Sequence, residues 1–132
     1  MTRKILLVDD DSNFRRVLAL ALELQGYLVR QASCGQSALD VLQNEIPDLI
    51  ISDFEMSGMD GAMLFRRTRA CARLSNIPFV ILSAFVNPGE STGLADLPAD
   101  RWVSKQISFA ELNSLIHGLL DGSAQVSRSG SQ

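Results

Sequence analysis

The chain has 132 residues, 46% of them hydrophobic, which suits one domain with a single buried core. Its formal net charge of -3 argues against a nucleic-acid surface or an anionic membrane surface, since both need an excess of Lys and Arg. No apolar run approaches the roughly 20 residues of a membrane helix, and the first residues carry no signal-peptide pattern. We therefore expect a cytoplasmic protein that binds neither nucleic acid nor membrane.

The first part of the chain predicts three strands separated by helices. Lys4–Val8 is a near-continuous apolar run, typical of a strand buried on both faces of a parallel sheet. A helical pattern follows, with Ser12 or the preceding Asp11 as its N-cap and Gly26 as a stop. Tyr27–Ala32 is the second predicted strand, and a second helical pattern separates it from a third strand at Leu49–Ser52.

The second part continues the alternation. After a loop rich in Gly and Ser, a helix is expected over residues 62–72, and Phe79–Leu82 is the fourth predicted strand. A fifth strand is centred on Trp102. The last helix begins with a capping-box pattern at Ser108 and is expected to end at Gly122.

Five strands that alternate with helices predict right-handed crossovers and a parallel sheet covered on both faces. The expected fold is α/β, a doubly wound five-stranded parallel sheet of the flavodoxin-like (βα)5 kind. The fourth helix should be short or irregular, because Asn87–Asp100 contains two prolines and two glycines. We expect one domain over residues 1–121, followed at 122–132 by a polar, small-residue tail or the start of a linker.

Three carboxylates should meet at one edge of this sheet. Asp9 and Asp10 follow the first strand and Asp53 ends the third, and the ligand site of an open parallel sheet lies at the carboxyl ends of its strands. Crowded carboxylates repel one another, and a hard divalent cation with oxygen ligands keeps them ionised. The pattern therefore predicts a Mg²⁺ site.

A hydroxyl and an ammonium should reach the same edge. Ser83 ends the fourth strand and Lys105 follows the fifth. Together with the cation they favour a reaction in which Asp53 attacks an activated phosphoryl group, Lys105 offsets charge on its oxygens and Ser83 donates a hydrogen bond. The product would be an acyl phosphate on Asp53.

These residues resemble the response-regulator receiver family of two-component signalling, over the chain from about Lys4 to Leu120. Each motif is short, but all five occur in the family's order and each lies at a strand end. The motifs are ILLVDD with Asp9 and Asp10, DLIISD ending at Asp53, MDG at Met59–Gly61, VILSA with Ser83, and WVSK with Lys105.

The resemblance implies a role for each site residue and a set of partners. The implied Mg²⁺ ligands are the carboxylates of Asp10 and Asp53, the backbone carbonyl of Glu55 and, through water, Asp9. Ser83 would be the switch hydroxyl and Trp102 the aromatic residue that turns inward behind it. A histidine kinase or phosphotransfer protein would donate the phosphoryl group, and a downstream protein would bind the altered face.

The chain departs from the family after its lysine. Gln106 stands where the family usually has a proline after a cis peptide bond. Because a non-proline cis bond costs about 2.5 to 4 kcal/mol, we expect a trans bond and a re-aimed Lys105 side chain.

Three other functions remain as alternatives. A pseudo-receiver that binds a partner without phosphorylation is favoured by Gln106 but not by the complete set of site residues. An aspartate phosphotransferase of the dehalogenase type would need an aspartate two residues after Asp53, where Glu55 stands. A flavin site would need a phosphate-binding loop after the first strand, where acidic residues stand instead.

The leading interpretation is a phosphoacceptor switch rather than a turnover enzyme. The oligomeric state and the signalling pathway stay open.

Overall fold

A single parallel sheet organises the part of the chain that the computed structural model describes, residues 2–84 and 101–129. The strands are β1 (Lys4–Val8), β2 (Leu28–Ala32), β3 (Leu49–Asp53), β4 (Phe79–Ser83) and β5 (Trp102–Ser104). The helices are α1 (Ser12–Leu24), α2 (Gly35–Leu42), α3 (Gly61–Ala70) and α4 (Phe109–Ser129). The strand order is β2-β1-β3-β4-β5, and every neighbouring pair is parallel. The predicted doubly wound, flavodoxin-like sheet is confirmed.

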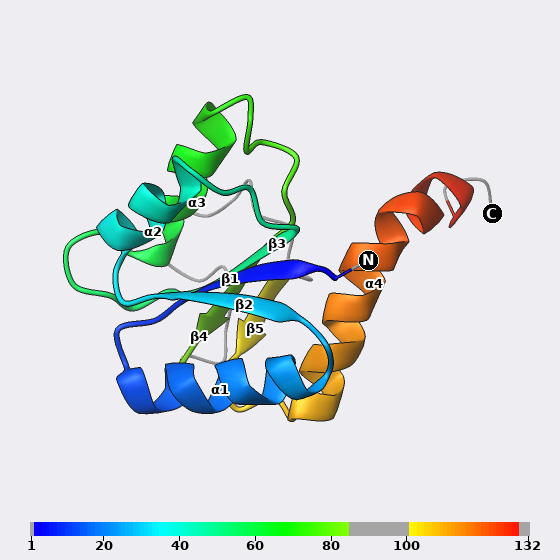
Figure 1. Ribbon diagram of the computed structural model, residues 1–132, viewed down its shortest axis with the longest axis horizontal. Coiled ribbons are helices and arrows are strands. Elements are labelled where there is room, and N and C mark those ends of the chain that lie inside the picture. Colours follow the sequence, from blue (N-terminus) through cyan, green and yellow to red (C-terminus); the bar gives the residue numbers. More distant parts are fainter. Residues whose placement is uncertain (1, 85–100, 130–132) are drawn as a thin grey trace.

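Two cores form because successive side chains of a strand point to opposite faces. In β1, Leu6 and Val8 join the core under α2 and α3, whereas Ile5 and Leu7 join the core under α1 and α4. Figure 1 shows the two pairs of helices on opposite faces of the sheet. All five residues of β3 and of β4 are buried, as expected for central strands covered on both sides. This burial holds the strand ends in fixed positions.

Two helix ends bear on the sequence expectations. Of the two candidate N-caps of α1, Asp11 is the one observed, because the Asp11 carboxylate accepts hydrogen bonds from the backbone N–H groups of Asn13 and Phe14. The predicted end of the last helix at Gly122 is wrong, since α4 continues to Ser129. A glycine inside a helix costs only about 1 kcal/mol, and no proline follows it to stop the helix. The domain boundary at residue 121 and the linker role of residues 122–132 stay predictions.

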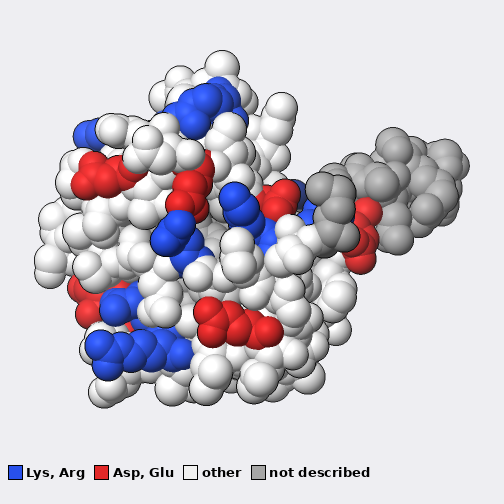
Figure 2. All heavy atoms as spheres, viewed as in Figure 1, with Lys and Arg blue, Asp and Glu red and all other residues white. Residues whose placement is uncertain are grey.

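The expected irregular fourth helix at Asn87–Asp100 lies outside the described residues. Within the described ranges, no helix combines the length and the apolar character needed to cross a membrane. On the face shown in Figure 2, the described Lys and Arg side chains are interspersed with Asp and Glu rather than gathered into one basic area.

A close backbone approach at Gly61 fixes the loop that follows β3. The Gly61 N–H donates to the Phe54 carbonyl at 3.0 Å. A Cβ atom at Gly61 would lie 2.6 Å from the Asp53 carbonyl oxygen, too close for any real side chain. Only glycine therefore lets α3 begin directly against the end of β3.

We expect Gly61→Ala to lower the free energy of unfolding by about 1 to 3 kcal/mol, since the new methyl group can be accommodated only if backbone moves. Gly118→Ala is the matched control: it lies within α4, nothing lies within 4 Å of its Cβ position, and it should stabilise by up to about 1 kcal/mol. Urea unfolding of both variants measures the difference. Equal effects would contradict the steric argument.

Candidate functional site

Four neighbouring strands deliver the candidate site residues to one edge of the sheet. Asp9 directly follows β1, Asp53 ends β3, Ser83 ends β4 and Lys105 follows β5. Backbone pairing between the strands aligns these positions. Asp53 pairs with Leu82, and the Lys105 N–H donates to the Ser83 carbonyl at 2.8 Å. Parallel pairing thus brings together side chains that are far apart in the sequence.

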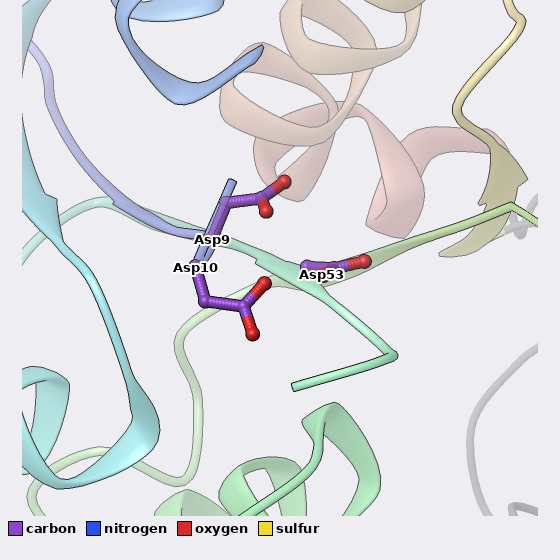
Figure 3. Close-up of side chains that lie close together, drawn as sticks. All are labelled: Asp9, Asp10 and Asp53. Carbon is purple, nitrogen blue, oxygen red and sulfur yellow. The ribbon is translucent and has the colours of Figure 1, made fainter. Parts of the chain in front are cut away.

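The three carboxylates converge as the sequence predicts. Asp9, Asp10 and Asp53 each offer an oxygen, and these oxygens lie within 4.8 Å of one another. Asp9 is 1% exposed and Asp53 3%, whereas Asp10 is exposed to solvent. Figure 3 shows the three side chains pointing to the same side of the strand ends. An ion bound there could reach all three carboxylates from the open side of Asp10.

Lys105 lies against the two buried carboxylates. Its Nζ is 3.0 Å from Asp9 Oδ2 and 3.2 Å from Asp53 Oδ1. The bond before Gln106 is trans, as expected, and Lys105 still reaches both buried carboxylates. The Phe14 ring supplies an unforeseen contact, with Lys105 Nζ 4.6 Å from its centroid. A cation held over an aromatic face adds to the ion pairs in keeping the ammonium in place.

Burial and charge shift the proton equilibria of this group. Burial, and then the negative charge of Asp9, raise the pKa of Asp53 from 3.8 to about 7, although Lys105 opposes the shift. Burial alone would lower the pKa of Lys105, but its hydrogen bond to Asp9 and the charge of Asp53 raise it. The lysine therefore stays charged, while Asp53 titrates near neutrality as long as no further cation shares the site.

Ser83 is fully buried and its hydroxyl faces Glu55. Ser83 Oγ donates to Glu55 Oε2 at 2.8 Å, and the Ala84 N–H donates to Glu55 Oε1 at 3.3 Å. The sequence placed Glu55 beside the site and implied a Mg²⁺ ligand in its backbone carbonyl, but it did not predict this side-chain contact with Ser83. The sole signal in the sequence was its position two residues after Asp53.

Trp102 lies inside the core, 6% exposed. Its ring packs against the ring of Phe54, with centroids 5.0 Å apart and planes tilted by 45°. Phe54 directly follows Asp53 in the chain. The inward aromatic residue on β5 is therefore in contact with the residue next to the buried aspartate, and its switching role stays a prediction.

The fold and this strand-end group of three carboxylates and one lysine define a flavodoxin-like domain with an acidic site. Residues 5–117 match the family described as the response regulator receiver domain, and the chain belongs to that family.

Among curated relatives, the chain is 36% identical over 118 residues to a probable transcriptional regulator ycf27 of Cyanophora paradoxa, a match that covers 89% of this chain and 48% of the relative. The chain spans about half the length of the curated relatives it matches.

Two solved structures show the same architecture. The chemotaxis response regulator CheY4 of Vibrio cholerae has a TM-score of 0.83 at 27% identity, covering 91% of this chain and 100% of its own. The signal receiver domain of a signal transduction histidine kinase from Syntrophus aciditrophicus has a TM-score of 0.83 at 31% identity, covering 92% of each chain. Both matched structures are described as a response regulator or a signal receiver domain. The similarities therefore do not favour the pseudo-receiver alternative.

We expect the buried charge of Asp53 to make the metal-free protein more stable in acid than at neutral pH. Because its pKa is about 7 in the folded state and 3.8 without the fold, the folded state binds this proton more tightly. The stability that it contributes is complete below about pH 4 and is lost as the pH rises through about 7. The loss should exceed about 1 kcal/mol, since one pKa unit corresponds to about 1.4 kcal/mol.

Asp53→Asn tests this expectation in urea unfolding with EDTA at pH 4 and pH 8. The variant should be more stable than wild type at pH 8, and the difference should shrink at pH 4. Asp40→Asn, at an exposed carboxylate, controls for a general change of charge. If Asp53→Asn changed the stability equally at both pH values, the raised pKa of Asp53 would be contradicted.

Proposed function

We propose that this receiver domain accepts a phosphoryl group on Asp53 from a histidine kinase or phosphotransfer protein, in a Mg²⁺-dependent reaction, and then changes its partner-binding face. The observation that carries the proposal is the position of Asp53: a buried carboxylate at the end of central strand β3, 3.2 Å from the Lys105 ammonium and beside two further carboxylates. A signalling switch of this kind is a phosphoacceptor and not a turnover enzyme.

The chemistry follows from the arrangement of the residues. A carboxylate oxygen of Asp53 attacks phosphorus, and the bond between phosphorus and the donor's imidazole nitrogen breaks, its electron pair leaving with that nitrogen. Lys105 is placed to offset negative charge on the phosphoryl oxygens. The product is an acyl phosphate, and its later hydrolysis by water is the self-dephosphorylation that we also propose.

The donor set fits Mg²⁺. Three carboxylate oxygens lie within 4.8 Å of one another, and Lys105 balances only one of the three negative charges. Asp10 and Asp53 would hold the ion directly, with the Glu55 backbone carbonyl as a further ligand and Asp9 acting through water. When bound, Mg²⁺ supplies the charge stabilisation that lets Asp53 stay ionised next to an incoming phosphoryl group.

Ser83 and Trp102 form the proposed switch. The Ser83 hydroxyl turns to the phosphoryl group, and Trp102 adjusts behind it at β5. We propose that the receiver unit spans residues 1–121, that residues 122–132 begin a linker, and that the chain acts in the cytoplasm on a downstream protein.

Phosphorylation is tested by intact mass after incubation with Mg²⁺ and acetyl phosphate. Wild type should gain a single phosphate that is absent in Asp53→Ala and absent without Mg²⁺, because both the nucleophile and the cation are required. Unfolding curves confirm that the variant is folded. A folded wild-type protein that binds Mg²⁺ but gains no phosphate would overturn the proposal and favour the pseudo-receiver alternative.

The Mg²⁺ site is tested by stability in the presence of the ion. At ten- to thirtyfold excess over the dissociation constant, Mg²⁺ should stabilise wild type by about 1.4 to 2 kcal/mol. Asp10→Asn removes one ligand charge and should weaken binding at least about tenfold.

Asp11→Asn is the matched control, because Asp11 is the next residue but caps α1, a role that asparagine also fills. Equal losses of Mg²⁺ stabilisation in the two variants would contradict the assignment of Asp10.

A further inference from the structure

The Glu55 carboxylate binds the end of β4 through two contacts. One oxygen accepts the Ser83 hydroxyl at 2.8 Å, and the other accepts the Ala84 N–H at 3.3 Å. Ser83 is fully buried, so its hydroxyl exchanges this partner for water only if the local packing opens. A hydrogen bond to an ionised acceptor is about twice as strong as one between neutral groups. The hydroxyl is therefore firmly held by Glu55.

A serine hydroxyl has only one proton to donate. In the structure that proton is donated to Glu55. An oxygen of a phosphoryl group on Asp53 would need the same proton, so the two hydrogen bonds exclude each other. Ser83 must release Glu55 before it can bond the phosphoryl group.

The competition is direct because Glu55 and Asp53 share one short segment. Only Phe54 separates them in the chain, and negative charge already gathers there at Asp9, Asp10 and Asp53. A phosphoryl group adds further negative charge, which repels the Glu55 carboxylate at the same time as it attracts the Ser83 proton. Phosphorylation thus acts on both ends of the Ser83–Glu55 hydrogen bond.

We propose, building on the phosphoacceptor function above, that Glu55 is a positioning residue that holds the Ser83 hydroxyl in the unphosphorylated arrangement and sets how readily the domain switches. The bond is a latch between the loop after β3 and the end of β4. Strengthening it favours the resting state, and weakening it favours the switched state, with no change in the groups that react.

Trp102 reports on the latch. It is the only tryptophan in the chain, and its ring packs on Phe54, the residue between Asp53 and Glu55. A rearrangement of the segment around Glu55 therefore alters the surroundings of Trp102. Its fluorescence can follow switching without an added label.

The experiment is a double-mutant cycle in full chains with Mg²⁺ and beryllofluoride, a stable mimic of the phosphoryl group on aspartate. The half-saturating beryllofluoride concentration is read from Trp102 fluorescence in wild type, Glu55→Gln, Ser83→Ala and the double variant. Glutamine keeps the shape of Glu55 but makes it a neutral acceptor. The titrations are run at high salt, which screens direct repulsion between Glu55 and the ligand.

Glu55→Gln should lower the half-saturating concentration, because a charged hydrogen bond becomes a neutral one. The fold-decrease in this concentration should be about fivefold larger when Ser83 is present than in the Ser83→Ala background. Asp60→Asn is the control, since it removes one charge from the same loop, where asparagine still caps α3. It should leave the midpoint unchanged.

The outcomes separate the latch from the proposed function. A wild-type response with equal Glu55→Gln effects in both backgrounds would overturn the latch alone, because the carboxylate would then act only through its charge. An unchanged midpoint in Glu55→Gln would do the same. No response of folded, Mg²⁺-bound wild type to beryllofluoride, together with no phosphate adduct by mass, would overturn the phosphoacceptor function and the latch with it.

Discussion

The crowding of negative charge at one edge of a buried parallel sheet is the constraint on which the rest of this structure depends. Asp9 and Asp53 are almost completely buried, and one lysine faces them both. Burying a carboxylate is unfavourable unless charge or hydrogen bonds compensate it. Lys105 can do so only because β5 pairs with β4 in a register that ends at this edge. The sheet therefore places the charges and also supplies the cation that makes their burial tolerable.

The shifted proton equilibrium of Asp53 is a consequence of this placement. The same burial that raises its pKa also limits the access of water to its carboxylate, and the neighbouring carboxylates that repel it form the acidic group in which we propose a divalent ion. A site with this much unrelieved negative charge is less stable without a cation than with one. In the proposed Mg²⁺ site, relief of this repulsion would add to the free energy of binding the ion. The well-packed central strands β3 and β4 provide the stability that allows this.

The sequence was sufficient for the sheet and for the residues at its edge, because both follow from rules that act along the chain. Apolar runs located the strands, alternation with helices made them parallel, and parallel strands bring their carboxyl ends together; these steps placed Asp53 and Lys105 at one site. The misses concern contacts that depend on three-dimensional packing. The ring of Phe14 under Lys105, and the Glu55 side chain on Ser83, join segments whose relative placement no local pattern encodes. The end of α4 was missed for a different reason, since one glycine weakens a helix without ending it.

The loop after β3 connects the acidic site to helix α3, to Trp102 in the core and to the end of β4. Gly61 lets α3 begin against the Asp53 carbonyl, so the segment from Asp53 to Gly61 is short and closely packed at both ends. Phe54 anchors it to Trp102 in the core, and Glu55 anchors it to β4. A segment fixed at several points cannot follow a chemical change at Asp53 by small continuous adjustments, because packed interiors rearrange between discrete arrangements. The hydroxyl proton of Ser83 has only one recipient at a time. In the proposed switch, the two alternatives for that proton correspond to two arrangements of the loop, and phosphorylation of Asp53 would choose between them.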